Sequence, residues 1–373
     1  MKKFFALTLV LAFVAISCCK HHKPYKPSNP KDNPTEQQDT IPAPEPDPNQ
    51  DPESIGVDCP FTIKTLKDST VILFGYRHWY DDISVLTDWT LSQDGGNSWL
   101  EPEWKAGDFY EKEAEFLILK AGTKVLIKGN QGKTNQCSIL FNKDCYVYGN
   151  LMSLIHWDDF ATRTELIENR AFAYLFEDNY CLLNHPTLDI LFPATTVTEE
   201  ACYYMFQDCR QLKRAPEIHA TNAPFGCYEY MFECCKQLEE APPVLPAEHV
   251  GMFAYHDMFD DCDSLKVGPE IKALTADDCA FQSMFAYCDS FEKAPSIKIE
   301  SLPNYCCLCM YMSCKKLNYV ECLSTNISAN NCTNRWLGNV ASEGTFVCAK
   351  GMKDKWPRGG SGIPDGWTII EAE

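Results

Sequence analysis

A motif that recurs about every 26 residues constrains the fold of this chain more than any other feature. Four near-identical copies begin with Met-Phe at Met205, Met231, Met258 and Met284, and two less regular copies begin at Leu175 and Met310. From Met205 onward, successive copies are 26, 27, 26 and 26 residues apart. A period in the twenties is the length of one solenoid coil. The sequence therefore predicts a stack of coils, each of which buries its apolar face against its neighbours.

Residues at the same position of successive copies form what we call a column. Because stacked coils lie about 4.8 Å apart, an apolar column predicts a continuous row of buried side chains. The expected structural columns hold Met, Phe, a Cys four residues after the Met, and a large apolar residue three residues after the Cys. Their members are Met205, Phe206, Cys209, Leu212, Met231, Phe232, Cys235, Leu238, Met258, Phe259, Cys262, Leu265, Met284, Phe285 and Cys288.

The cysteine column accounts for several of the 21 cysteines in the chain. In the first copy Asn179 takes the place of the Cys, as expected of an inward turn position where Asn or Cys packs or bonds against the bending backbone. Many cysteines in an exported protein normally indicate disulfides. Thiols placed by a packing column act first as small apolar side chains, so we expect mostly free cysteines and leave open an occasional bridge between coils.

The repeat resembles that of the BspA-like leucine-rich-repeat surface proteins, whose coils follow the pattern A/M-F-x-x-C-x-x-L-x-x-A/V-P. Prolines stand eleven residues after the first four methionines, and Cys202-Tyr203-Tyr204 matches a common lead-in. The tail at residues 362–368 is similar to the usual ending of the family. Leucine-rich coils have a strand on one side and a helix or 3₁₀ turn on the other. We expect an α/β repeat solenoid of this type, with about six coils of roughly 26 residues, preceded by a small all-β domain.

The N-terminal residues have the pattern of an exported lipoprotein. Two lysines precede an apolar run that is too short to span a bilayer as a helix, which is typical of a signal peptide over residues 1–18. The sequence ending Ser17-Cys18 is similar to the bacterial lipobox and predicts a lipid anchor at Cys18, with ordinary secretion as the alternative. Residues 19–56 are rich in proline and predict a disordered tether. We expect a bacterial lipoprotein of the outer membrane or cell surface.

The rest of the chain divides into three expected parts. Residues 57–150 contain several short β-prone runs separated by polar turns, which favours a small β-sandwich-like domain. Residues 151–325 form the expected leucine-rich-repeat solenoid. After Leu317 the repeat decays, and residues 326–373 are expected to form a cap over its C-terminal edge.

Motifs for enzyme chemistry are missing from the sequence. It has no G-x-S-x-G, H-E-x-x-H, P-loop or dinucleotide fingerprint, and its histidines follow no repeated spacing. Zinc at Cys306, Cys307, Cys309 and Cys314 is the less favoured alternative, because two of these positions belong to repeat columns. The net charge of −19 argues against a nucleic-acid partner, whose phosphates require a basic face. We expect no catalytic residue, cofactor or metal.

The sequence therefore favours a binding protein. Residues beside the prolines vary from coil to coil, and the expected contact residues are His219, Leu245, Lys272 and Lys298. The family resemblance implies an adhesin-like role, with an unknown protein or glycan at a host or bacterial surface as the ligand. A structural or self-associating surface spacer is the second hypothesis. A glycan-active enzyme is the third, because no local spacing suggests the paired carboxylates that such an enzyme needs.

Overall fold

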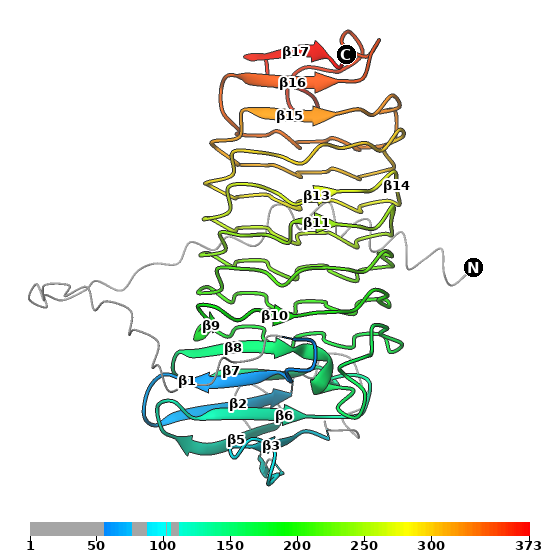
Figure 1. Cartoon of the computed structure of the whole chain (residues 1–373). Helices are drawn as coiled ribbons and strands as arrows, with labels where there is room; N and C mark the ends of the chain where they lie inside the picture. The colour runs from blue at the N-terminus through cyan, green and yellow to red at the C-terminus, as the bar shows by residue number, and fades with distance from the viewer. Residues whose placement is uncertain (1–55, 77–87, 102, 106–111) are drawn as a thin grey trace, which may run out of the picture. The chain divides into compact units, whose positions relative to one another are not determined.

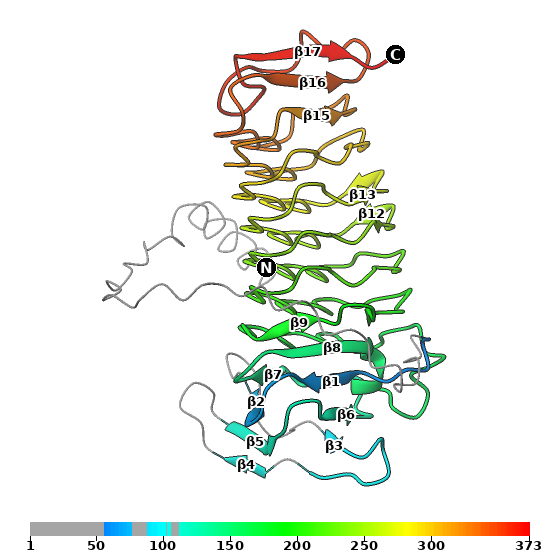
Figure 2. The same cartoon turned by 60° about the vertical axis from the view of Figure 1, so that its left-hand side comes forward.

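The computed structural model describes residues 56–76, 88–101, 103–105 and 112–373. The segment Ser54–Glu373 forms one compact unit. Its repeat region is a β-solenoid of about five turns of about 26 residues, stacked in chain order (Figures 1 and 2). The prediction of a solenoid is therefore confirmed. The predicted signal peptide, Cys18 and all but the last residue of the tether lie outside the described residues.

The prediction of an α/β solenoid of the leucine-rich-repeat type is wrong, because the coils lack the helical side that this type requires. Within the described ranges, the helical content is a single 3₁₀ helix, η1 (Leu151–Leu154). The side of each coil where a leucine-rich repeat would place a helix is instead a run of consecutive turns, such as residues 199–208. The coils are thus built from short strands and turns.

Alternating hydrogen bonds explain why these turns do not become helices. The N–H of Cys202 donates to the carbonyl of Cys227 in the next coil (2.8 Å), whereas the N–H of Met205 donates to Cys202 within its own coil (3.1 Å). The pattern alternates along the whole run and recurs in each coil. An α-helix would direct every N–H within its own segment. Here half of the N–H groups instead connect neighbouring coils, so the stack and not the local segment satisfies the backbone.

The turn runs require left-handed backbone at every fourth residue. In one coil these residues are Glu200, Tyr204 and Asp208, with φ between 53° and 58°. Residues other than glycine adopt this left-handed backbone conformation at a cost of about 1–2 kcal/mol each. Inter-coil hydrogen bonds and core packing must offset that cost, so an isolated coil should not be stable.

Two sheets form the N-terminal part of the described structure, and the first of them includes two strands of the first coil, β9 and β10. The first has the order β10-β8-β1-β6-β3 with β9 also on β8, and the second has the order β4-β5-β2-β7. Within both, strands β1 to β8 pair antiparallel, whereas β9 and β10 lie parallel to β8. The bounds are β1 (Thr62–Thr65), β2 (Thr70–Tyr76), β3 (Thr90–Ser92), β4 (Glu103–Lys105), β5 (Lys112–Leu119), β6 (Lys124–Lys128), β7 (Cys137–Phe141), β8 (Cys145–Asn150), β9 (Leu182–Asn184) and β10 (Ile190–Leu191).

Strands β7 and β8, one from each sheet, join the solenoid directly. The N–H of Ile139 in β7 donates to Leu175 of the first coil (2.7 Å), and that of Cys145 donates to Cys181 (3.0 Å). The side chain of Asn179 closes the same junction by donating to the carbonyl of Ile139 (2.8 Å). Strands β7 and β8 therefore provide the surface on which the first coil stacks.

The coils themselves contain only short parallel strands until the C-terminal end. Strands β11 and β12 pair with β13 and β14, respectively, one coil further on. The end of the stack is a three-stranded parallel sheet in the order β15-β16-β17. The bounds are β11 (Val244–Leu245), β12 (His249–Val250), β13 (Glu270–Ile271), β14 (Thr275–Ala276), β15 (Tyr319–Cys322), β16 (Gly344–Cys348) and β17 (Trp367–Glu371).

All fifteen residues assigned to the structural columns lie in the core with no exposed surface. The phenylalanine column forms a ladder of stacked rings. Phe232 lies 5.5 Å from both Phe206 and Phe259, with interplanar angles of 8° and 7°. Each ring is therefore packed between its equivalents in the coils before and after it.

The cysteine column contributes hydrogen bonds as well as volume. The thiol of Cys262 donates to the carbonyl of Phe232 (3.1 Å), which also accepts the N–H of Cys235 (3.1 Å). The same thiol-to-carbonyl contact recurs for Cys209, Cys235, Cys288 and Cys314 at 2.9–3.1 Å. The cysteines of this column are free thiols. Burial raises the pKa of the Cys262 thiol well above its usual value, which keeps it protonated as a donor.

Substitutions at Cys262 should separate these two contributions. Cys262→Ala removes both the donor and the sulfur volume and is expected to lower the free energy of unfolding by about 2 kcal/mol. Cys262→Ser keeps a donor and should cost about 1 kcal/mol. Chemical denaturation of the two variants measures the difference. A serine variant less stable than the alanine variant would show that the thiol acts only as an apolar filler.

Candidate binding surface

The strand side of the coils alternates between core and solvent. Residues 218, 245, 271 and 297 point inward and are buried, whereas their neighbours on either side point outward. The register of neighbouring coils aligns Leu245 with Ile271 and Val244 with Glu270. Outward residues therefore form two parallel columns, one before and one after the buried position.

Three of the four expected contact residues lie on this outward face. His219, Lys272 and Lys298 are exposed and occupy the column after the buried position. Leu245 is not a contact residue, because its side chain has no exposed surface. Its neighbours Val244 and Pro246 take the outward positions in that coil. A shift of one residue along a strand reverses the face, which explains the error.

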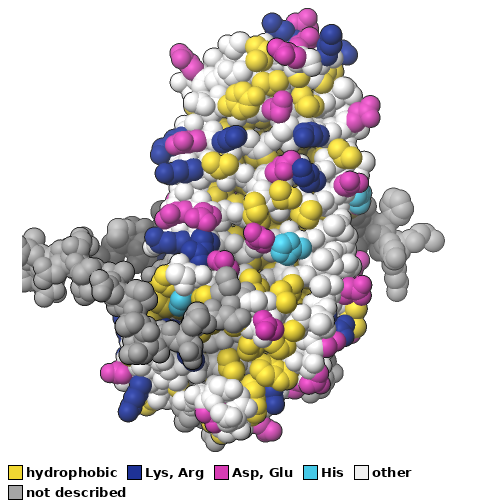
Figure 3. Space-filling model, viewed as in Figure 1, with side chains coloured by type: hydrophobic (Ala, Val, Ile, Leu, Met, Phe, Trp, Pro, Cys, Tyr) yellow, Lys and Arg dark blue, Asp and Glu magenta, His cyan; other side chains and the backbone are white. Residues whose placement is uncertain are grey.

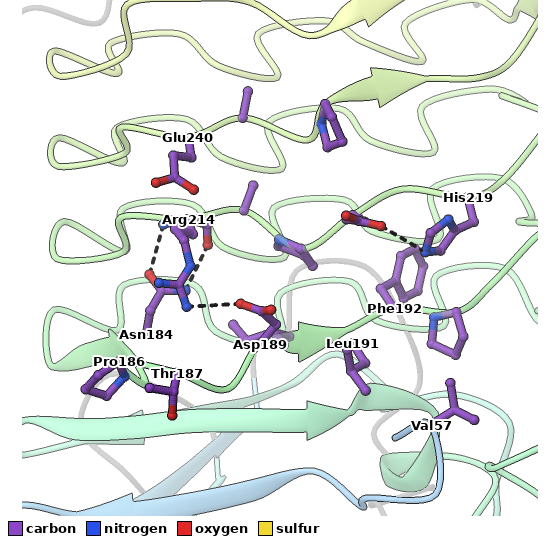
Figure 4. Close-up of a pocket in the computed structure, with 17 residues that line it drawn as sticks. Val57, Asn184, Pro186, Thr187, Asp189, Leu191, Phe192, Arg214, His219 and Glu240 are labelled. Atoms are coloured by element: carbon purple, nitrogen blue, oxygen red, sulfur yellow. Dashed lines mark hydrogen bonds and ion pairs between the residues drawn. The ribbon is translucent and has the colours of Figure 1, made fainter. Parts of the chain in front are cut away.

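A hollow of about 560 Å³ opens on this face across the first three coils (Figure 4). Arg214 is one of the residues that line it, and its guanidinium donates to Asp189 (3.0 Å) and to the carbonyl of His185 (3.1 Å). The side chain of Asn184 accepts the N–H of Arg214 (2.9 Å) and donates to its carbonyl (2.9 Å). The guanidinium is thus held in place before any ligand arrives, which lowers the entropy cost of binding.

The outward columns carry opposite charges side by side. Glu270 accepts from Lys272 at 2.6 Å, and Glu217 lies 3.7 Å from His219. The hydrogen bond from Lys272 lowers the pKa of Glu270. Figure 3 shows acidic, basic and apolar side chains interspersed over this view of the molecule. Such a surface suits a partner with mixed polar and apolar contacts.

The turn side of the stack contains a buried charged cluster that no sequence motif indicated. His256 lies between two carboxylates, with Nδ1 2.8 Å from Glu229 and Nε2 2.9 Å from Asp257. Burial alone would lower the pKa of His256, but the carboxylates of Asp257 and Glu229 outweigh burial and raise that pKa well above its usual value. The histidine is thus held as an imidazolium and is not poised to accept a proton.

Other side chains complete this cluster. The amide nitrogen of Gln282 is placed 3.0 Å from Nε2 of His256. An imidazolium donates from both nitrogens, so the amide oxygen of Gln282 is the group that can face Nε2. Burial, with the charge of Asp257 second, raises the pKa of Glu233 to about 8. The pKa of Asp260 is raised for the same two reasons.

The thiol-rich segment 306–314 forms part of the core. Cys306, Cys307, Cys309 and Cys314 have no exposed surface. Cys306 and Cys307 contact each other through a hydrogen bond that raises the pKa of the Cys307 thiol. In the described part of the chain, no group of three or more His, Cys, Asp or Glu side chains is arranged to hold a metal ion.

No family model, curated protein or solved structure matches this chain. Nor does the described part of the chain contain a helix of the length and apolarity needed to cross a bilayer. What characterises the chain is therefore its own geometry: a β-solenoid with a preformed hollow around Arg214 and a mixed-charge outward face.

Proposed function

We propose that this chain is a non-catalytic binding protein of the cell surface that recognises a protein or glycan ligand through the outward strand face. The observation that carries the proposal is the hollow around Arg214, whose guanidinium is already fixed by Asp189. It adjoins His219, from which the outward column continues to Lys272 and Lys298. A rigid stack that presents variable side chains at regular spacing is well suited to bind an extended surface.

The proposal includes the position of the protein in the cell. The signal-like residues 1–18 and the proline-rich residues 19–56 support export and a lipid anchor at Cys18. The repeat pattern supports kinship with the BspA-like leucine-rich-repeat proteins, in a form whose turn side is not helical. Adhesion to a host or bacterial surface is the role that best joins these features.

A triple variant that removes the side chains of the outward column tests the binding face. The purified protein is screened against host matrix proteins, mucins and glycans, with and without reductant. For a saturable ligand, combined substitution of His219, Lys272 and Lys298 by alanine is expected to weaken affinity by about tenfold or more, as for loss of several interface contacts. The circular dichroism spectrum should not change, because all three side chains are exposed.

A matched control removes lysines that lie elsewhere. Lys213, Lys266 and Lys293 are also exposed but precede the outward face in their coils. Their combined substitution by alanine should leave affinity unchanged. Equal losses in both variants would mean that only total charge matters and would contradict a localised face. A folded protein without any ligand, but with concentration-dependent sedimentation, would favour the self-associating spacer instead.

A further inference from the structure

A second hollow lies at the corner that follows the outward strand face. Its volume is about 730 Å³, within the range of ligand sites, and residues of three successive coils line it. Thr221, the first of these residues along the chain, stands two positions after His219. The corner hollow is therefore continuous in sequence with the surface proposed above to bind the ligand.

Much of the lining of the corner hollow is apolar. It includes Pro224, Pro246 and Met252, together with Phe225, whose side chain is 40 % exposed. The ring of Phe225 packs nearly perpendicular to that of Phe253, at 5.9 Å. Gly251 also lines the hollow, and a Cβ added to it would stand 2.8 Å from the carbonyl oxygen of Ala223. A large exposed aromatic ring next to tightly packed backbone can form a favourable contact with an apolar side chain of a partner.

The lining of the corner hollow also includes two carboxylates, those of Glu248 and Asp277. Glu248 is exposed, and no lysine or arginine in the described ranges forms an ion pair with it or with Asp277. Nε2 of His249 lies 3.7 Å from the carboxylate of Asp277. The other ring nitrogen of His249 contacts Thr275 (2.9 Å). This differs from the strand face, where Lys272 neutralises Glu270.

We propose that the corner hollow binds a partner segment in which an arginine or lysine stands beside an aromatic or large aliphatic side chain. The apolar side chain would bury Phe225 and Pro246, and the cation would approach Glu248 and Asp277. A guanidinium also interacts favourably with the face of an aromatic ring such as that of Phe225. The net charge of −19 further attracts basic partners. This inference names the ligand chemistry of the proposed binding function and rests on it.

Labelled peptides test the inference directly. The probe is Gly-Ser-Arg-Phe-Arg-Ser-Gly, and fluorescence anisotropy measures its binding to the purified protein. We expect at least about tenfold weaker binding when both arginines are replaced by glutamate or when the phenylalanine is replaced by glycine. Binding of the probe should weaken as salt is raised from 50 to 300 mM, because the charges of Glu248 and Asp277 are screened. Equal binding of the three peptides, or no saturable binding of the probe, would overturn the proposal.

Variants then locate the site. Phe225→Ala, and the pair Glu248→Gln with Asp277→Asn, should each weaken binding of the probe by about fivefold to tenfold. Leu274→Ala and Glu300→Gln are the controls, because both side chains are exposed and neither lines the hollow. Affinity that is insensitive to Phe225→Ala would overturn the assignment.

The two proposals can fail separately. A large ligand that depends on His219, Lys272 and Lys298 but not on Phe225 would leave the proposed function standing and remove this inference. Saturable probe binding that depends on Phe225, in a protein for which the ligand screen finds nothing, would support the corner hollow and count against the broader function.

Discussion

Replacing Phe232 by alanine is expected to lower the free energy of unfolding by about 3–5 kcal/mol, as for other fully buried phenylalanines. The side chain has no exposed surface and stacks on Phe206 and Phe259 at 5.5 Å. Its loss opens a cavity in the middle of the ladder and removes two ring contacts. Urea denaturation followed by circular dichroism measures the effect.

Phe225 provides a control of the same residue type. Because it is 40 % exposed and lies outside the buried core, Phe225→Ala should cost less than about 1 kcal/mol. Leu238→Ala, in another buried column, should resemble Phe232→Ala and cost about 2–5 kcal/mol. If Phe232→Ala melted at the temperature of the unmodified protein, the ladder would not hold the coils together.

The second large effect is a loss of stability as pH rises. Burial, followed by the charge of Asp257, raises the pKa of Glu233 to about 8 from an ordinary value of 4.5. Between these two values the folded chain keeps a proton that the unfolded chain releases. Stability must therefore fall as pH increases through this window. One pKa unit corresponds to about 1.4 kcal/mol, so the upper limit for Glu233 alone is about 5 kcal/mol.

His256 acts in the same direction. Its pKa is raised by Asp257 and Glu229 against the effect of burial. The folded chain thus holds its proton above pH 6.5, where the unfolded chain loses it, and the stabilisation disappears as pH rises through the folded pKa. Asp260, whose pKa is also raised by burial and by Asp257, adds to this trend. Together these groups predict higher stability near pH 5.5 than at pH 8.

Melting temperatures at pH 5.5, 6.5, 7.5 and 8.5 measure this trend. Glu233→Gln is the matched variant, because the amide has nearly the shape of the carboxyl group but cannot ionise. It should flatten the pH dependence and melt above the unmodified protein at pH 8.5. A melting temperature that stays constant or rises between pH 5.5 and 8.5 would show that these carboxyl groups are ionised and solvated.

The stacking register of the core could be predicted from the chain, because it repeats. Met205, Phe206, Cys209 and Leu212 have equivalents at a fixed spacing in the later coils. Residues at equivalent positions of stacked coils are buried to the same extent. The same argument placed Asn179 in the cysteine column, where its side chain donates to Ile139 just as the cysteines donate to phenylalanine carbonyls. The prediction of Leu245 as a contact residue was wrong, because successive side chains along a strand point to opposite faces.

The turn side could not be predicted in the same way. Left-handed positions are normally marked by glycine or asparagine, whereas here Tyr204, Asp208 and Cys234 occupy them. Nothing local in these residue types indicates that alternate N–H groups will donate to the next coil. The charged cluster was missed for the same reason, because Glu229 and His256 are 27 residues apart and meet only after stacking.

The sequence by itself determined the period, the direction of growth and the side chains of the core, since these depend on spacing along the chain. Only the tertiary structure decided the backbone of the turn side, the buried imidazolium of His256 and the two hollows around Arg214 and Phe225. The physical reason is that each of these features is shared between coils. A hydrogen bond, an ion pair or a hollow that spans two or three coils exists only once they are stacked.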